Sequence, residues 1–260
     1  MTRVLSGVVL GAVFLAVIWF AGTLVLLGVA LVVAGLAFQE YAGLARALDI
    51  RLPLAPAAVA TVAVVAVMVY PRVPVAAVLS AAVMASAVAV MASGRTGAAT
   101  MGDMAAGLLA PVYLGLPLGA LVALHQARGR EVVLLLIATV VVSDSGQYYA
   151  GRLLGRTPLA PRLSPKKTRE GAVGGFVLAP AFLAGAGWYV LPSVSTVALV
   201  VLGLAVVAAG IAGDLFESML KRAANMKDSS SLIPGHGGVL DRIDALLFAT
   251  PVFYFVLQAL

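Results

Sequence analysis

Carboxylate, hydroxyl and basic side chains gather in residues 214–244, "DLFESMLKRAANMKDSSSLIPGHGGVLDRID", near the end of an otherwise apolar sequence. The first part of this segment carries four polar residues at the helical intervals i, i+3, i+4 and i+7: Asp214, Glu217, Ser218 and Lys221. A helix would therefore hold all four on one face. The ten residues "SSSLIPGHGG" are too polar and too rich in glycine to continue a helix, so they predict a loop. A second helix is expected from about Asp241, with Asp244 on the same face.

This arrangement supplies the chemical groups that phosphate transfer requires. Carboxylates from two helices can hold Mg²⁺, which takes hard oxygen ligands and keeps several waters and substrate phosphates. Positive charge for the phosphates would come from four residues around the loop: Lys221, Arg222, Lys227 and Arg242. The glycines of "PGHGG" let the backbone approach a ligand closely. The segment therefore predicts a phosphoryl- or nucleotidyl-transfer site.

The composition places this site in a membrane protein. Of the 260 residues, 62% are hydrophobic and 11% are charged, whereas a soluble domain carries about a quarter of charged residues. Apolar runs recur along the whole sequence, which predicts an all-α integral membrane protein. The lack of cysteine excludes disulfides and Cys-ligated metal centres. The net charge of +6 favours anionic lipid or phosphate as partners rather than nucleic acid.

Windows of about 20 apolar residues define the expected membrane spans. Nine such windows occur, near residues 4–20, 22–38, 54–70, 74–92, 105–126, 131–151, 173–191, 195–222 and 240–259. We interpret the first as a transmembrane helix rather than a signal peptide, because its apolar run is long and a second span follows at once. The sequence shows no internal repeat, so residues 1–260 are expected to form a single polytopic membrane domain.

The distribution of basic residues predicts the orientation of the chain. If the N-terminus is cytoplasmic, the segments that follow the second, fourth, sixth and eighth spans are cytoplasmic too. The opposite side then keeps Arg72, Arg128 and Arg130, which leaves 14 of the 17 basic residues on the cytoplasmic side. Because Lys and Arg concentrate in cytoplasmic loops, we expect a cytoplasmic N-terminus and an active site on the cytoplasmic side of a bacterial inner membrane.

A second polar segment, residues 152–172, is expected to be cytoplasmic as well. Within it, "GRTPLAPRLSPKKTREG" holds three prolines and five basic residues against one acid. Proline at this density excludes a long helix. The segment therefore predicts an extended basic loop that lies on the lipid headgroups.

Residues 218–244 resemble the signature of the phosphatidate cytidylyltransferases, which are also called CDP-diacylglycerol synthases. The family pattern S-x-x-K-R-x4-K-D, then P-x-H-G-G, then D-R-x-D is met at every defining position. Upstream, "SDSGQYYAGRLLG" and "LSPKKTREG" are similar to the family's D-[ST]-x-x-Y, G-R and S-P-K-K-T-x-E-G blocks, and "QEY" at 39–41 also fits. Two departures are Gln147, where a small residue is usual, and Arg169, where Trp is common.

The resemblance implies a Mg²⁺-dependent reaction of CTP with phosphatidic acid that gives CDP-diacylglycerol and pyrophosphate. It implies Asp214 and Asp241 as the metal ligands and leaves a second metal ion open. By the same resemblance, three catalytic cations would face the triphosphate or the lipid phosphate: Lys221, Arg222 and Lys227. The implied substrate-binding residues are Asp144, Ser164, Lys166, Lys167, Ser218, His236, Gly237, Gly238 and Arg242.

Structural explanations compete with the assignments of the acids. Asp214 taken alone would equally suit a salt bridge to a basic neighbour. Asp241 taken alone is typical of a first-turn acid in the last helix. Asp144 would contact nucleotide or metal, or pair with Arg152.

Three further features have structural explanations. His236 suits a hydrogen bond that fixes the loop as well as it suits a contact to phosphate or base. The small residues "GAVGGF" at 171–176 favour helix packing over a phosphate cradle. Asp103 is expected to cap the helix of the fifth span.

Two other functions remain open from the sequence. A CTP-dependent polyprenol or lipid kinase would release CDP, but the D-R-x-D and S-P-K-K blocks favour the cytidylyltransferase. An ion-coupled secondary transporter would use Asp144 and Asp214 as proton or cation sites, yet transporters often show repeated halves with binding at the midplane. Charges gathered at one face favour an enzyme. The sequence leaves open both a monomer and a homodimer that packs through small-residue faces.

Overall fold

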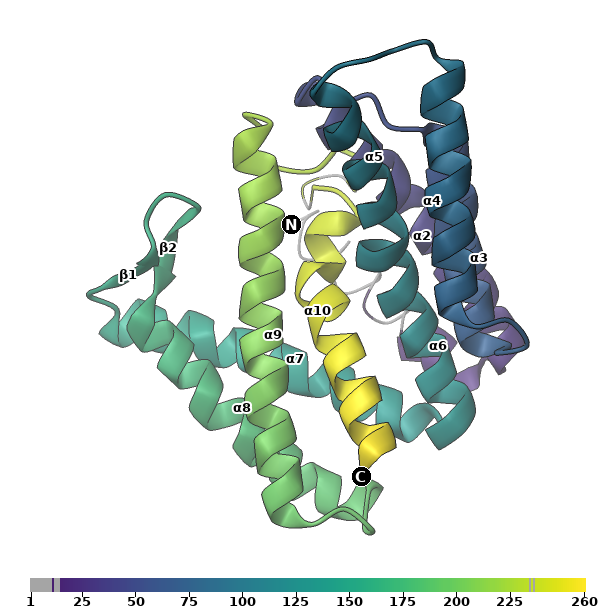
Figure 1. Ribbon diagram of the computed structural model, residues 1–260. Coiled ribbons are helices and arrows are strands. Elements are labelled where there is room, and N and C mark those ends of the chain that lie inside the picture. The colour runs from purple at the N-terminus through teal and green to yellow at the C-terminus, as the bar shows by residue number, and fades with distance from the viewer. Residues whose placement is uncertain (1–10, 12–14, 234, 236) are drawn as a thin grey trace. The chain divides into compact units, whose positions relative to one another are not determined.

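The computed structural model describes residue 11, residues 15–233, residue 235 and residues 237–260, which form helices and one short hairpin (Figure 1). The first predicted span, 4–20, lies mostly outside the described residues. The chain then forms α2 (Thr23–Ala47), α3 (Leu54–Val69), α4 (Val75–Ala92), α5 (Ala99–Ala110), η1 (Pro111–Gly115), α6 (Leu116–Arg128), α7 (Arg130–Leu154), β1 (Pro158–Ala160), β2 (Ser164–Thr168), α8 (Arg169–Val190), α9 (Thr196–Ala223) and α10 (Leu240–Ala259). Each predicted span from residue 22 onward overlaps one of these helices or, for 105–126, the run α5–η1–α6, although α2 extends nine residues beyond the predicted end at 38.

Among the described residues, six helical stretches are long and apolar enough to cross a membrane: α2, α4, the continuous run Ala99–Arg128, α7, α8 and α9. The helix α3 is apolar but has 16 residues. Large apolar side chains such as Val88 and Met91 on α4 point away from the protein interior. Such exposure suits a bilayer, because lipid tails are as apolar as these side chains. The prediction of an all-α membrane protein is confirmed.

The chain divides into two compact units, and each is described by itself. Unit 1 comprises residues 1–126 and 220–242, and unit 2 comprises residues 127–219 and 243–260. The helices α9 and α10 each contribute residues to both units.

In unit 1, α3 packs against α2, α4, α5 and η1. Glycines allow these close approaches, because a Cβ at Gly115 would lie 2.7 Å from the carbonyl oxygen of Thr61, and one at Gly119 would lie 2.7 Å from Cβ of Met68. The π-helical turn η1 begins at Pro111. Proline has no N–H for the α-helical hydrogen bond, and a wider turn accommodates that loss.

Asp103 does not cap α5, so that prediction is wrong. It lies within the helix, where its carboxylate accepts a hydrogen bond from the backbone N–H of Arg51 at 2.7 Å and pairs with Arg95 at 2.5 Å. Its side chain is 5% exposed, and a carboxylate buried to this degree requires partners. The two contacts tie the segment before α3 to the segment before α5.

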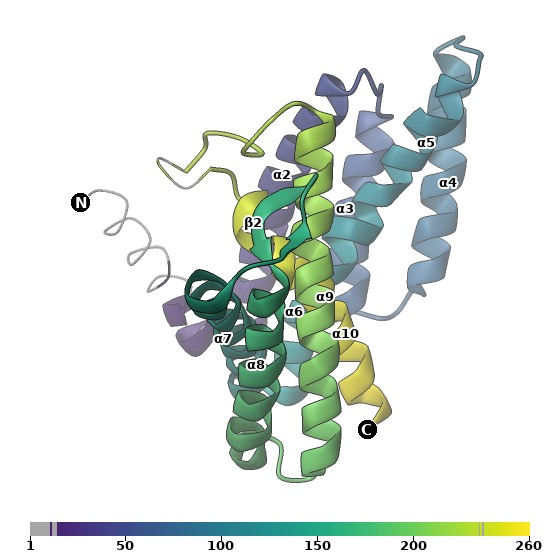
Figure 2. The same ribbon diagram turned by 90° about the vertical axis from the view of Figure 1, so that its left-hand side faces the viewer.

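In unit 2, α7 and α8 pack tightly side by side (Figure 2). A Cβ at Gly146 would lie 2.9 Å from the carbonyl oxygen of Gly174, and one at Gly175 would lie 2.9 Å from Cγ of Gln147. The small residues of "GAVGGF" therefore serve helix packing, as the sequence predicted. Further along, Gly203 of α9 fits against Pro180 of α8, where a Cβ would lie 2.6 Å from Cα of the proline.

The basic segment between α7 and α8 forms an antiparallel hairpin of β1 and β2. Its extended conformation agrees with the prediction. The sequence did not predict that the two strands pair, with Pro158 opposite Thr168. The hairpin is fixed at its base, because the Glu170 carboxylate accepts hydrogen bonds from the backbone N–H groups of Arg156 and Thr157. The Thr168 hydroxyl caps the start of α8 by accepting from the N–H of Gly171 at 3.0 Å.

Candidate active site

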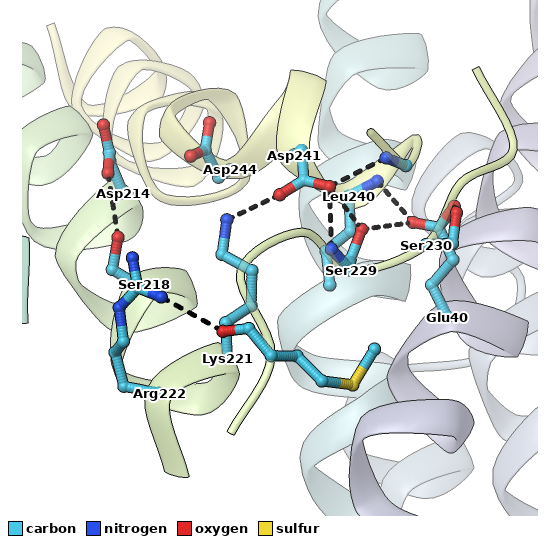
Figure 3. Close-up of polar contacts among 12 residues, drawn as sticks. Glu40, Asp214, Ser218, Lys221, Arg222, Ser229, Ser230, Leu240, Asp241 and Asp244 are labelled. Carbon is cyan, nitrogen blue, oxygen red and sulfur yellow. Dashed lines mark hydrogen bonds and ion pairs between the residues drawn. The ribbon is translucent and has the colours of Figure 1, made fainter. Parts of the chain in front are cut away.

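In unit 1, a largely shielded, partly buried ion pair joins the last turn of α9 to the first turn of α10. Lys221 Nζ lies 2.5 Å from Asp241 Oδ1, and the two side chains are 12% and 6% exposed (Figure 3). Charges held this far from water interact more strongly than a surface pair, although their desolvation offsets part of the gain. The signature loop, residues 224–239, connects these two helix ends, and those of its residues that the structure describes are not helical, as predicted for "SSSLIPGHGG".

The second carboxylate oxygen of Asp241 organises the signature loop. Asp241 Oδ2 accepts hydrogen bonds from Ser229 N at 2.9 Å, from Ser229 Oγ at 2.7 Å and from Gly238 N at 2.7 Å. The first-turn role that the sequence offered for Asp241 is therefore present, since its side chain reaches back to an N–H just before α10. Both oxygens of this carboxylate have partners within unit 1.

Glu40 of α2 contacts the same loop, and the sequence had not singled it out as a functional residue. Its carboxylate accepts hydrogen bonds from the hydroxyls of Ser229 and Ser230 and from the N–H groups of Val239 and Leu240. The available signal was the "QEY" triplet, which matched the resemblance but suggested no role. No periodicity links α2 to a loop about 190 residues later.

The glycines of the loop approach carboxylates of the chain itself. Gly237 has φ +79, and a Cβ there would lie 2.7 Å from Asp241 Oδ2. A Cβ at Gly238 would collide with the Ser229 hydroxyl and with the Glu40 carboxylate. The sequence had predicted that these glycines make room for a ligand, and the structure adds these internal partners. His236 lies outside the described residues.

The other three predicted cations of unit 1 have exposed side chains: Arg222, Lys227 and Arg242. Arg222 Nη1 donates to the carbonyl oxygen of Met226 at 3.2 Å, a contact typical of a basic residue at a helix C-terminus. Exposure leaves the charged groups of these residues accessible to an anionic ligand.

In unit 2, Asp214 of α9 pairs with Lys167 of β2. Lys167 Nζ lies 2.6 Å from Asp214 Oδ2, with the side chains 20% and 32% exposed. The Ser218 hydroxyl lies 3.5 Å from Asp214 Oδ1, one helical turn away. The salt bridge that the sequence had offered as an alternative for Asp214 is therefore present, and its partner is a predicted phosphate-binding lysine.

Asp144 of α7 lies within electrostatic range of both members of this pair, Lys167 and Asp214. Its carboxylate accepts a hydrogen bond from Gln147 Nε2 at 3.2 Å. Arg152, the alternative partner for Asp144, donates instead to the Tyr148 hydroxyl at 3.0 Å. The departure at Gln147 thus supplies a hydrogen-bond donor to a predicted site residue.

Lys166 and Lys167 are consecutive residues of β2, so their side chains lie on opposite faces of the strand. Lys166 is exposed, whereas Lys167 is partly buried against α9. Ser164 lies at the start of β2 and is partly buried, and Arg169 at the start of α8 is exposed. In unit 2 the structure therefore gathers Asp144, Lys167, Asp214 and Ser218, while Lys166 points to solvent.

Within the described residues, no three or more His, Asp or Glu side chains are gathered as a metal site. Magnesium does not require such a cluster, because it is usually held by one or two carboxylates together with waters and substrate phosphates. Asp214 fits this chemistry as a partly exposed carboxylate. Asp241 fits it as a carboxylate beside a loop of hydrogen-bond donors.

Comparison with known proteins then identifies the family. A model of the cytidylyltransferase family matches residues 1–260. The chain belongs to the cytidylyltransferase family. This membership agrees with the resemblance that the signature residues had indicated.

Several curated relatives of this cytidylyltransferase family member are named phosphatidate cytidylyltransferase. The protein of Haemophilus influenzae is 44% identical over 130 residues, 48% of this chain and 45% of that protein. The Helicobacter pylori protein is 42% identical over 137 residues, 53% and 51% of the two chains, and the Pseudomonas aeruginosa protein is 45% identical over 129 residues, 48% of each. The chain thus spans about half the length of the curated relatives it matches.

Proposed function

We propose that this protein is a phosphatidate cytidylyltransferase that converts CTP and phosphatidic acid to CDP-diacylglycerol and pyrophosphate. The observation that carries the proposal is the partly buried Lys221–Asp241 pair, bound to a loop of hydrogen-bond donors, in an otherwise apolar chain of the cytidylyltransferase family. The names of the curated relatives support the same activity.

The reaction is a displacement at phosphorus. A phosphate oxygen of phosphatidic acid attacks the α-phosphorus of CTP and forms a new P–O bond. The bond from the α-phosphorus to the α–β bridging oxygen breaks, and pyrophosphate leaves with the electron pair. Because the nucleophile is already an anion, no strong base is needed, and the protein contributes positioning and charge neutralisation.

The chain's cations have the properties that neutralisation requires. In this proposal Lys221, Arg222 and Lys227 face the triphosphate or the lipid phosphate. Lys167 exchanges its Asp214 partner for a phosphate oxygen, an exchange that the partial exposure of both side chains permits. Further phosphate contacts are assigned to Ser164, Lys166, Ser218, Gly237, Gly238 and Arg242, and Asp144 is assigned to the nucleotide.

We assign magnesium to the carboxylates of Asp214 and Asp241, each as an oxygen ligand. When bound, the ion would neutralise phosphate charge. The assignment of Asp214 is supported by its accessible carboxylate, and that of Asp241 by its place in the signature. The proposal requires one ion and leaves a second one open.

In the membrane, we propose nine spans with a cytoplasmic N-terminus, which places the active site on the cytoplasmic side of a bacterial inner membrane. The bias of the basic residues supports this orientation. The proposal holds for a monomer and for a homodimer alike.

The test uses the purified full-length protein with phosphatidic acid, Mg²⁺ and CTP labelled in the cytosine ring. We expect label in the extracted lipid and one pyrophosphate released per label transferred. CDP released with alcohol lipids, without lipid label, would instead identify a kinase. Neither product from folded protein would refute both enzymes and favour an ion-coupled transporter.

A further inference from the structure

Glu40 is a buried carboxylate in the C-terminal third of the apolar helix α2. It is 6% exposed and belongs to α2, a candidate membrane span. A charge in such a place is expensive unless hydrogen bonds compensate it. Both of its oxygens are compensated, and all four donors come from the segment 229–240.

Two of these donors are the backbone N–H groups at the start of α10. Val239 N donates to Glu40 Oε1 at 2.9 Å, and Leu240 N donates to Glu40 Oε2 at 2.8 Å (Figure 3). The first N–H groups of a helix have no partner within the helix, and an acidic side chain commonly satisfies them. Here the capping acid comes from a helix about 200 residues earlier in the chain.

The other two donors are serine hydroxyls, and one of them connects Glu40 to Asp241. Ser229 Oγ lies 2.9 Å from Glu40 Oε2 and 2.7 Å from Asp241 Oδ2. A hydroxyl has one hydrogen and donates to one carboxylate at a time, so Ser229 is held between the two acids. Gly238 packs against this junction with no room for a side chain.

We propose that Glu40 is a positioning residue for the active site. It binds Ser229, Ser230, Val239 and Leu240 and thereby sets the position of the Asp241 carboxylate and of its partner Lys221. It acts through the loop and does not touch substrate. The kinetic part of this inference rests on the proposed function, whereas the structural part does not.

The test compares Glu40→Gln and Glu40→Asp with the wild-type full chain in detergent and in vesicles. The loop provides a direct readout, because Lys227 is exposed within it and trypsin cleavage there reports how often the loop opens. Glu40→Gln replaces a buried charged acceptor by a neutral amide, so at least one strong hydrogen bond to the loop is lost. We therefore expect trypsin cleavage after Lys227 to become about tenfold faster or more. We expect kcat for cytidylyl transfer to fall by a similar factor, with a smaller change in KM, and Glu40→Asp to restore part of both.

Two further variants keep the test decisive. Asp49→Asn is the control, because it removes an exposed acid from the same unit. Residue 49 has φ 59, a conformation that asparagine tolerates. This variant should match wild type in both readouts. Ser230→Ala removes one donor from the loop side and should shift both readouts in the direction of Glu40→Gln, but less. This milder variant gives an answer even where Glu40→Gln does not fold.

The outcomes are distinct. Wild-type protection of Lys227 in Glu40→Gln and Ser230→Ala would overturn the inference, whatever their activity. Faster cleavage in both variants, with no cytidylyl transfer even by wild type, would support the loop anchor and refute the proposed function alone. Faster cleavage with unchanged kcat would overturn the positioning role.

Discussion

The two carboxylates assigned to magnesium differ in how their oxygens are engaged. Asp241 is bound by Lys221 and by three donors of the signature loop. Asp214 is more exposed and has Lys167 and Ser218 as partners. Replacing Asp241 would therefore disturb the signature loop together with any metal site, whereas replacing Asp214 removes an ion pair to Lys167 of β2 and leaves the hydrogen bonds of the signature loop in place. Asp214 is the cleaner residue for a mutational test.

We expect Asp214→Asn to lower kcat for cytidylyl transfer by about 100-fold or more, because it removes an anionic oxygen ligand that we assign to magnesium, the ion that would neutralise phosphate charge. The thermal midpoint should stay close to that of wild type, since the side chain is partly exposed and the amide still accepts from Ser218. The exposed acid Glu131 of the same unit provides a control, and Glu131→Gln should leave turnover unchanged. Near-normal turnover in Asp214→Asn would remove Asp214 from the metal site.

Gly238 is a second residue whose role is set by its immediate contacts. We expect Gly238→Ala to lower kcat about tenfold or more, because a methyl group there collides with the Ser229 hydroxyl and the Glu40 carboxylate, and losing a hydrogen bond to a charged group is worth about a tenfold effect. Gly43→Ala is the matched control, because a Cβ at Gly43 meets nothing within 4 Å. The measurement is cytidylyl transfer at saturating CTP. Equal rates in the two variants would mean that the close packing at Gly238 has no role in turnover.

At the scale of helices, the sequence predicted the positions of the helices along the chain, because hydropathy determines them. The bounds of α4 and α9 lie within a residue of the predicted spans 74–92 and 195–222, because lipid requires long apolar runs that are visible in one dimension. The partners of Glu40 and Asp214 could not be predicted. Both pairings join residues distant in the chain, and a single acid carries no periodicity that points to its partner. The same holds for Asp103, whose partners decide that it is a structural link and not a cap.

The packing of α7 against α8 allows a test at this scale. Gly174→Ala should destabilise the protein by about 1 to 3 kcal/mol, because the added methyl overpacks a contact with Ala150 and with the carbonyl oxygen of Gly146. Gly185→Ala, on the same helix α8 but with nothing within 4 Å of its Cβ, should be neutral. Thermal unfolding in detergent measures both. An unchanged thermal midpoint in Gly174→Ala would show that the contact between α7 and α8 accommodates a methyl group without loss of stability, contrary to their close packing.

At the scale of the whole molecule, the outer surfaces of the helices carry little information about partners. Val88 and Met91 of α4, like Leu24 of α2, are apolar and exposed, as expected for side chains in contact with lipid. Polar side chains are instead concentrated at helix ends and in the connecting segments, where Lys and Arg also set orientation. The orientation therefore depends on which connections share a side of the membrane.

Orientation can be measured directly because the chain has no cysteine of its own. Three candidate spans lie between residues 72 and 162: α4, the run Ala99–Arg128, and α7. An odd number of crossings puts these two residues on opposite sides, so a membrane-impermeant maleimide should label Arg162→Cys from the cytoplasmic side and Arg72→Cys from the other. Right-side-out and inside-out vesicles give the two exposures, and labelling after detergent controls for reactivity. Labelling of both cysteines from one side would mean that one of the three helices does not cross, and labelling with both sides exchanged would reverse the proposed cytoplasmic N-terminus.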